Sequence, residues 1–557
     1  MEVCIIKSIY RRYRKLVVVS FIMATLVALS VLPYPLVLKY FVDNVIPAQK
    51  MNDIVLWSIM LLVVVLIRIV CNFFQNYSLS IVEGRFERDL KVSMFEKVIK
   101  MPMSFFVKND TGSIMSRITN DSSNSVGLYR DYYVPLYSSI LGLTAACAVM
   151  LYMDWFLTLI SFILLPVLMV VSSVMNGKMA KESMKMSESY QGVSKEISDG
   201  INAIETVKID NLYNTVLNRF KTAANKLMKV NVNINKYGAW AGGFMTGIVS
   251  LAPILVFIVG TFRVIDGNTT IGAVISISNL ILLLFTPINE IAMAGIKMQK
   301  PKALWKKIDE LMQMKEERLD KGTMNGYDLK LEDVDFAYDN RDNIFNGINI
   351  SIPEGDFVSI VGKTGSGKST LYKILAKFYD CAKGKYTVGG KSGDKISTAN
   401  LRDRIAYINR NTYIFNGTLR ENISLGKQIE MRELQEAMKI ACLDETFNLD
   451  SETGDQGKGI SDGQRVRIAI ARAVIKKPDI FMIDEALTAL DPVTEGKVLQ
   501  NLKNKFPKSS FLVITHRDTV FDHSDKICIL ENEKFSKGYS KEEIKKIDGF
   551  REIFSEV

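Results

Sequence analysis

Long apolar stretches dominate the first half of the chain and lie almost wholly before Phe285. Six of them are close to or above the ~20 residues that a helix needs to cross the hydrocarbon core of a bilayer. We therefore expect spanning helices at residues 16–38, 54–74, 132–153, 155–175, 237–262 and 271–288. Only Asp154 separates the third stretch from the fourth, so a very tight turn should join those two helices.

Two other interpretations of these stretches are weaker. Apolar stretches in the core helices of soluble proteins usually run to ~10–14 residues, and several of these are longer. Arg11, Arg12 and Arg14 precede the first stretch, as in a cleaved signal peptide. That stretch nevertheless exceeds the ~7–15 apolar residues of a signal peptide. The pattern therefore favours a chain that crosses the membrane six times.

Basic residues are concentrated in two of the connections between the expected spans. Residues 75–131 contain eight Lys or Arg and residues 176–236 contain ten, whereas the intervening connections contain only Lys39, Lys50 and Arg263. Lys and Arg are retained on the cytoplasmic side of a membrane. Both chain termini should therefore be cytoplasmic.

The composition excludes several other classes of protein. The net charge of +10 is mostly this topogenic charge, together with contact to anionic lipid headgroups, so no nucleic-acid partner is expected. Six Cys are scattered without CxxC spacing, which is typical of reduced thiols rather than of disulfides or metal ligands. Only His516 and His523 are present, which argues against a histidine-based metal site.

The chain should contain at least two folding units, because 557 residues exceed the ~100–200 typical of one domain. We expect a six-helix α transmembrane domain at residues 1–300, a polar linker at 301–325 and a soluble α/β domain at 326–557. The two inner connections are too long for simple turns, so we interpret them as cytoplasmic extensions of the membrane helices. Strands are predicted at residues 331–336, 348–352 and 357–361.

A phosphate-binding loop directly follows the last of these strands. Residues 362–369 fit the pattern G-x-x-x-x-G-K-[ST], and a helical pattern continues at residues 370–378. The expected nucleotide-binding residues are Gly362, Lys363, Thr364, Gly365, Ser366, Gly367, Lys368, Ser369 and Thr370. The glycines let backbone N–H groups surround a polyphosphate, and the helix N-terminus adds a favourable dipole. We expect Lys368 to reach the β- and γ-phosphates and the Ser369 hydroxyl to ligate Mg²⁺.

An acidic pair follows a second apolar strand, at residues 480–483. Asp484 should hold Mg²⁺ through water and Glu485 should polarise the attacking water, a division of roles that phosphoryl transfer requires. An acidic pair after a strand is weak evidence for a catalytic site by itself. Downstream of a phosphate loop it indicates a nucleotide-hydrolysing P-loop domain.

These residues resemble the ATP-binding cassette (ABC) family, specifically exporters whose membrane domain precedes the cassette on one chain. Residues 460–473 are similar to the family signature and its helix, residues 489–491 to the D-loop, and residues 105–121 and 201–210 to the cytoplasmic loops whose coupling helices dock on a cassette. His516 is similar to the switch histidine, which makes it a catalytic candidate beside Glu485. The resemblance further implies nucleotide-binding roles for Tyr338, Arg410, Ser461, Gly463, Gln464 and Asp491.

The resemblance also implies an assembly and a location. In this family each ATP lies between the phosphate loop of one cassette and the signature of another, so a chain with one cassette implies a dimer. Its partner would be a second copy of the chain or a related half-transporter, in a bacterial plasma membrane. ATP and Mg²⁺ would drive alternating access, which moves a transported substrate across the lipid bilayer.

Two positions depart from the family pattern. Arg410 stands where the family has the Q-loop glutamine, and a guanidinium binds phosphate but cannot ligate Mg²⁺. Asp462 replaces a signature glycine, which places a carboxylate near the γ-phosphate on the partner chain and opposes closure. We expect the positive charge of Arg410 to offset this carboxylate in part. Alternatively, Asp462 caps the signature helix.

Two functions remain compatible with the sequence. Glu485 and His516 favour an ATP-hydrolysing exporter, whereas Arg410 and Asp462 favour a nucleotide-gated membrane regulator or sensor that moves little or no cargo. No motif identifies the cargo, so peptides, lipids and amphipathic small molecules all remain.

The orientation generates a labelling prediction. In a variant without native cysteines, Lys50→Cys and Gly267→Cys should react with a membrane-impermeant maleimide in intact cells, because both positions lie in outer connections. Lys195→Cys should react only after the membrane is opened, since it lies in a basic inner connection. Labelling of position 195 in intact cells would contradict the orientation.

Overall fold

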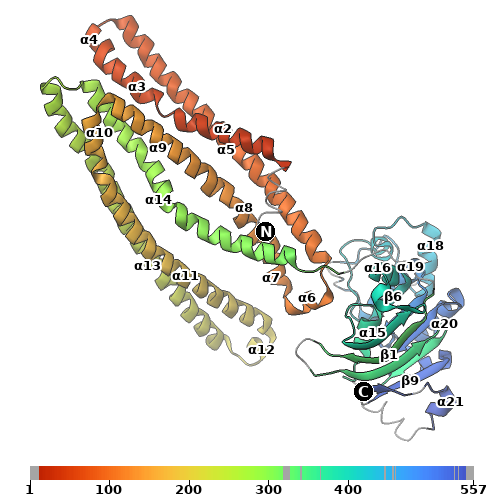
Figure 1. The fold of residues 1–557 in the computed structure, drawn as a ribbon. Coiled ribbons are helices and arrows are strands. Elements are labelled where there is room, and N and C mark those ends of the chain that lie inside the picture. Colours follow the sequence, from red (N-terminus) through yellow and green to blue (C-terminus); the bar gives the residue numbers. More distant parts are fainter. Residues whose placement is uncertain are drawn as a thin grey trace. The chain divides into compact units, whose positions relative to one another are not determined.

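The computed structural model describes residues 12–546, except 318–325, 339–341, 364, 444–446, 455–456, 458, 532 and 537. The chain forms two compact units. One comprises Met1–Ile99 with Thr111–Met314, and the other comprises Lys100–Asp110 with Lys315–Val557. In Figure 1 the first consists of long helices and the second of β-sheets covered by helices.

The helices of the first unit are α2 (Arg14–Leu29), α3 (Pro33–Tyr40), α4 (Ile46–Ala48), α5 (Met51–Ile99), α7 (Thr111–Ser116), α8 (Ser122–Leu128), α9 (Val134–Met153), α10 (Trp155–Phe162), α11 (Leu164–Asn202), α12 (Ile204–Ile209), α13 (Tyr213–Ile265) and α14 (Ile271–Gln313), with π-helical turns at Phe41–Val45, Arg117–Asp121 and Tyr129–Tyr133. Helix α11 packs along α13, α9 along α14, and α2 along α5. Helices α5, α11 and α13 extend far beyond the expected spans, which confirms that the inner connections prolong the membrane helices. Helix α14 likewise includes the first residues of the expected linker.

The expected number of six spans is not confirmed. Among the described residues, five helices are long and apolar enough to cross a membrane: Arg14–Ala48, Met51–Ile99, Thr111–Met153, Tyr213–Ile265 and Ile271–Gly295. The expected span at residues 155–175 is not in this set; α10 and α11 meet there at Ile163, whose backbone stays in the right-handed helical region.

The tight turn at Asp154 is confirmed. Helix α9 ends at Met153, and Asp154 adopts an extended conformation and caps α10. One carboxylate oxygen accepts hydrogen bonds from the backbone N–H groups of Phe156 and Leu157, at 3.0 and 3.1 Å. The other lies 3.1 Å from Nε of Arg263, on α13. One buried carboxylate therefore both starts α10 and ties it to a distant helix.

The second unit contains two sheets. A four-stranded antiparallel sheet has the order β2 (Phe345–Ile352), β1 (Leu329–Phe336), β4 (Lys383–Val388) and β5 (Lys391–Ser392). A six-stranded sheet has the order β10 (Lys534–Phe535), β9 (Lys526–Glu531), β3 (Phe357–Val361), β8 (Ser510–Ile514), β7 (Ile480–Asp484) and β6 (Ile405–Asn409). The helices are α6 (Met103–Lys108), α15 (Lys368–Leu375), α16 (Thr398–Arg404), α17 (Leu419–Ser424), α18 (Met431–Ile440), α19 (Asp462–Lys476), α20 (Pro492–Lys505) and α21 (Lys541–Ile544).

The central strands β3, β7 and β8 are buried at every position. Their continuous apolar sequences are typical of parallel strands covered on both faces. They pair in parallel, with Ile360 opposite Ile514 and Asp484 opposite Ile514. The residues that follow all three strands therefore meet at one edge of the sheet, where open α/β sheets bind ligands.

A buried ion pair joins α20 to the segment after β8. The Glu495 carboxylate is almost fully buried, and Nη1 of Arg517 lies 2.5 Å from its Oε2. The same guanidinium donates hydrogen bonds to the backbone carbonyls of Leu490 and Thr488, at 2.8 and 2.9 Å. Arg517 therefore connects the end of β8 with the loop after β7.

Loss of this arginine should destabilise the second unit. Arg517→Ala leaves a carboxylate buried without its counter-charge, which costs about 3–5 kcal/mol. The Tm of this unit should fall by roughly 6–20 °C, which calorimetry of the purified full-length protein measures. The matched control is Arg404→Ala, because Arg404 pairs with Asp479 at 3.4 Å on the surface. That change should cost less than about 1 kcal/mol, and equal shifts for the two variants would contradict the argument.

Candidate functional site

The phosphate loop connects β3 to α15, as the sequence pattern predicts. Gly365 and Gly367 have φ angles of 85° and 98°, in the left-handed region that favours glycine. A Cβ on Gly367 would also lie 2.7 Å from a methyl carbon of Ile344. The backbone therefore needs glycine at this position. Thr364 lies outside the described residues.

Lys368 lies at the centre of the loop and is almost completely buried. Its Nζ donates hydrogen bonds to the backbone carbonyls of Gly362 and Lys363, at 2.6 and 3.0 Å. Burial lowers the pKa of Lys368, and the nearby carboxylates of Glu485 and Asp484 oppose this shift. The ammonium group is thus held inside the loop, where it can meet a phosphate.

Ser366 gives independent support for a phosphate ligand. Its Oγ is buried and has no hydrogen-bond partner within the described part of the chain. A buried hydroxyl without a partner is costly, and a phosphate oxygen at the loop would supply the missing acceptor.

Asp484 connects three segments of the chain. Oγ of Ser369 donates to its Oδ1 at 3.1 Å, and the hydroxyl of Tyr407 donates to its Oδ2 at 2.9 Å. Burial raises the pKa of Asp484, while the hydrogen bonds from Tyr407 and Ser369 oppose the shift. A carboxylate beside a hydroxyl is an oxygen-ligand set that suits Mg²⁺, so Ser369 and Asp484 fit the expected metal roles.

Tyr407 is a site residue that sequence reasoning missed. It lies on β6, inside the apolar run at residues 405–408, and β6 pairs in register with β7 so that Asn409 lies opposite Asp484. A polar ring within a buried strand is the only signal that the sequence offered. Its reach to Asp484 depends on the order of the strands in the sheet.

Glu485 and His516 converge beside Lys368. Oε1 of Glu485 lies 3.9 Å from Nζ of Lys368 and 3.4 Å from Nε2 of His516. Glu485 has a φ of 51°, an uncommon conformation for a residue other than glycine, and such conformations cluster at functional sites. Nδ1 of His516 is buried and lacks a partner among the residues that the structure describes. The structure thus brings the two expected catalytic residues together.

The signature forms the start of α19. Ser461 is the N-cap residue: its Oγ accepts from the backbone N–H of Gln464, and the Gln464 side chain accepts from the backbone N–H of Ser461. A Cβ on Gly463 would lie 2.8 Å from the carbonyl oxygen of Ala489, so this position requires glycine. The interpretation of Asp462 as the cap is wrong, because Ser461 holds that position and Asp462 is the first helical residue.

The two departures from the family pattern are paired in one chain. Nη2 of Arg410 lies 3.2 Å from Oδ2 of Asp462, and both side chains are about three-fifths exposed. The predicted charge compensation is therefore geometrically in place. Because both groups are solvated, the pair contributes little to stability itself.

Two further candidates occupy neighbouring positions. The Tyr338 hydroxyl lies 3.2 Å from Oγ1 of Thr370, at the start of α15, and Nζ of Lys373 lies 5.8 Å from its ring centroid. Asp491 caps α20, since its Oδ1 accepts from the backbone N–H groups of Val493 and Thr494. An adenine-stacking role for Tyr338 and a D-loop role for Asp491 stay predictions.

Comparison with known proteins identifies both parts of the chain. Residues 17–288 match the family described as the ABC transporter transmembrane region, and residues 345–488 match the ABC transporter family. The uncharacterized ABC transporter ATP-binding protein YwjA of Bacillus subtilis is 29% identical over 94% of this chain and 93% of its own length.

More distant relatives have names that describe transport. The lactococcin-G-processing and transport ATP-binding protein LagD of Lactococcus lactis is 28% identical over 88% of this chain and 71% of its own length. The ATP-dependent lipid A-core flippase of Blochmanniella pennsylvanica is 27% identical over 86% and 84%, respectively.

A solved structure shares the fold along nearly the whole chain. It is a bacterial Atm1-family ABC exporter with ATP bound, with a TM-score of 0.85, 22% identity and coverage of 98% of this chain and 99% of that one. The order of membrane helices and cassette, the phosphate loop and the two family matches agree. The chain therefore belongs to the ABC transporter family, as a membrane exporter whose cassette is an ATPase coupled to transport.

Proposed function

We propose that the chain works as a dimer in which ATP and Mg²⁺ bind between the phosphate loop of one cassette and the signature of the other. The convergence of Lys368, Asp484 and Glu485 at one sheet edge carries this proposal. Ser369 and Asp484 would hold Mg²⁺, which neutralises charge that develops on the phosphates. Glu485 orients the attacking water, and His516, 3.4 Å away, holds the Glu485 carboxylate.

The two cytoplasmic loops support a dimer. The first loop contributes Lys100–Asp110 to the cassette unit, where Phe105 is buried and the carbonyl of Lys100 accepts from the backbone N–H of Glu317 at 2.8 Å. The second loop forms α12, at the tip of the α11–α13 hairpin, and leaves Ile209 80% exposed. Exposed apolar side chains at such a tip favour a protein surface to cover them, and a second cassette would supply it.

The proposed cargo is an amphipathic molecule, either a peptide or a lipid, exported from the cytoplasm across a bacterial plasma membrane. The relatives are bacterial, and their names cover both a lactococcin transporter and lipid A-core flippases. The basic inner connections support a cytoplasmic cassette and cytoplasmic termini.

Arg410 and Asp462 are the two residues that favour the regulator hypothesis, and their pairing weakens that argument. Each residue taken alone would place an unbalanced charge near bound ATP. At 3.2 Å they neutralise each other, so the closing surfaces of the cassette have little extra net charge at this point.

Two substitutions should separate binding from hydrolysis. Glu485→Gln removes the group that orients water, so steady-state ATPase in lipid nanodiscs should fall by about 10²–10⁴-fold while ATP still binds. Lys368→Ala removes the buried ammonium from the phosphates and should abolish both binding and turnover. Glu433→Gln, on the surface beside Lys477, is the control and should behave as wild type. Normal ATPase in Lys368→Ala would contradict the site, and a wild-type protein without turnover in every lipid tested would support the regulator.

The pair at positions 410 and 462 should show energetic coupling. Asp462→Gly removes a carboxylate next to a polyanion and frees Arg410, so turnover should rise roughly two- to fivefold. Arg410→Gln should lower it, because Asp462 then lacks its counter-charge. ATPase measurements on both single variants and the double variant give the coupling, which should depart from additivity.

The control for this cycle is Arg420→Gln, which disrupts an exposed pair with Asp450 elsewhere on the cassette and should leave turnover unchanged. Strict additivity would show that the pair does not act through charge. A purified chain that neither self-associates nor hydrolyses ATP until a different cassette chain is added would exclude the homodimer.

A further inference from the structure

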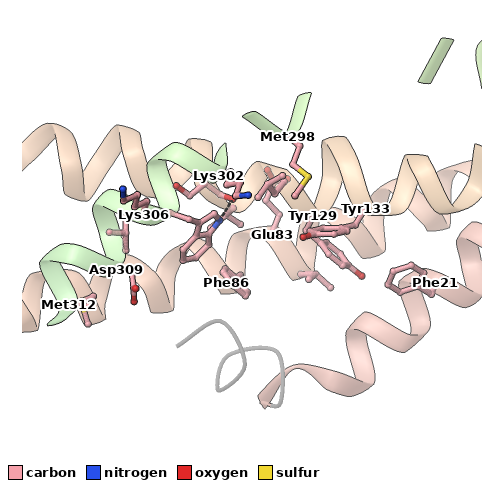
Figure 2. Close-up of a pocket in the computed structure, with 16 residues that line it drawn as sticks. Phe21, Glu83, Phe86, Tyr129, Tyr133, Met298, Lys302, Lys306, Asp309 and Met312 are labelled. Carbon is pink, nitrogen blue, oxygen red and sulfur yellow. Dashed lines mark hydrogen bonds between the residues drawn. The ribbon is translucent and has the colours of Figure 1, made fainter. Parts of the chain in front are cut away.

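A pocket of about 530 Å³ lies inside the helical unit, between α5, α8, the π-helical turn Tyr129–Tyr133, α14 and the middle of α2. Figure 2 shows its lining along the second half of α14, with Phe86 and Met298 contributing apolar surface. Trp305 also lines the pocket. The volume falls within the ~300–1,000 Å³ of small-molecule sites, and such sites combine an apolar lining with a few placed polar groups.

The pocket has an apolar end near the membrane and a charged end away from it. Phe21 and Tyr133 lie close to the first residues of the expected spans 16–38 and 132–153. Lys302 and Lys306 lie on α14 on either side of Trp305, whose indole bonds Ser125, about 10 Å before the first residue of the expected span 132–153. Figure 2 shows the same sequence along the pocket, from Phe21 through Tyr133 and Tyr129 to Lys302 and Lys306.

The charged end has unbalanced positive charge. Arg130 balances Glu83 at 3.2 Å. Asp309 accepts a hydrogen bond from the neutral Gln313 amide at 2.5 Å and offsets one of the two lysine charges, so one positive charge remains. Lys302 and Lys306 are four residues apart and therefore share a face of α14. Neither makes an ion pair or hydrogen bond with the residues described in the structure, and both are exposed. Two solvated ammonium groups beside an apolar pocket match a ligand with an anionic head and an apolar body.

We propose that this pocket binds an anionic phospholipid of the adjacent leaflet. Its headgroup contacts Lys302 and Lys306, and its acyl chain extends past Trp305 and Tyr129 toward Phe21. The direction of the pocket, from charge to apolar surface, is the direction of a lipid in that leaflet. Basic residues at the membrane surface attract anionic lipids, and a basic pocket between helices concentrates that attraction on one headgroup.

Trp305 provides a probe at the pocket. Its Nε1 donates to the carbonyl of Ser125 at 3.0 Å, which fixes the indole against α8. The other three tryptophans, Trp57, Trp155 and Trp240, do not line this pocket, so their replacement by Phe leaves a single reporter. Trp305 bonds Ser125, about 10 Å before the first residue of the expected span 132–153, so bilayer lipids reach it only by entering the pocket.

The test uses full-length single-tryptophan protein in phosphatidylcholine nanodiscs that contain equal fractions of one brominated lipid, with bromine near the carboxyl end of the acyl chain. Brominated phosphatidylglycerol should quench Trp305 more than brominated phosphatidylcholine. The preference should fall roughly fivefold for each ammonium removed, by Lys302→Gln and Lys306→Gln. Lys307→Gln is the matched control, because Lys307 is adjacent on α14 but does not line the pocket, and this variant should keep the preference.

Equal quenching by the two lipids, or no quenching, would overturn the proposal. A preference that survives in the Lys302→Gln, Lys306→Gln double variant would also overturn it. An unchanged Trp305 emission maximum in pure phosphatidylcholine shows that each variant retains the pocket. Because the quenching measurement contains no nucleotide, a negative result would leave the ATPase proposal unchanged. Likewise, loss of ATPase in the Glu485→Gln variant would leave the lipid-binding proposal unchanged.

Discussion

The Asp484 carboxylate accepts one hydrogen bond from the phosphate-loop helix and one from the neighbouring strand, and the arrangement of the nucleotide site depends on these contacts. Ser369 and Tyr407 are 38 residues apart in sequence, and Asp484 follows Tyr407 by 77 more. Burying a carboxylate is costly unless its oxygens accept hydrogen bonds, so the bonds from Ser369 and Tyr407 offset the cost of burying Asp484. Parallel pairing with β6 and β8 sets the direction of β7, and Glu485 follows Asp484 directly, beside Lys368 and His516.

The two departures from the family pattern have a common physical explanation. Asp462 adds negative charge at the surface where a second cassette would bring ATP, and Arg410 supplies the counter-charge from the loop after β6. Each substitution alone changes the charge of the closing surface, whereas the pair changes mainly its hydrogen-bonding groups. Because both side chains are solvated, their effect belongs to nucleotide binding and closure rather than to the stability of the fold.

The helical unit shows a similar separation between stability and binding. Asp154 satisfies two backbone N–H groups and pairs with Arg263, so its charge is used within the fold. Beside Lys302 and Lys306, Arg130 balances Glu83 and Asp309 offsets one ammonium group, which leaves one positive charge for a ligand. Charged residues near a bilayer therefore have to be considered with their neighbours before a role is assigned.

The sequence by itself determined the elements whose signals are local. Apolar length marked the membrane helices, Asp154 marked a turn, and glycine spacing with a following Lys-Ser marked the phosphate loop between β3 and α15. Tertiary structure decided what depends on distant neighbours. The capping of α19 by Ser461 rather than Asp462 is set by cap geometry, and the reach of Tyr407 to Asp484 is set by strand order. Local patterns specify which helix or strand forms, but only the folded chain determines which side chains meet, because those contacts join segments that are far apart in sequence.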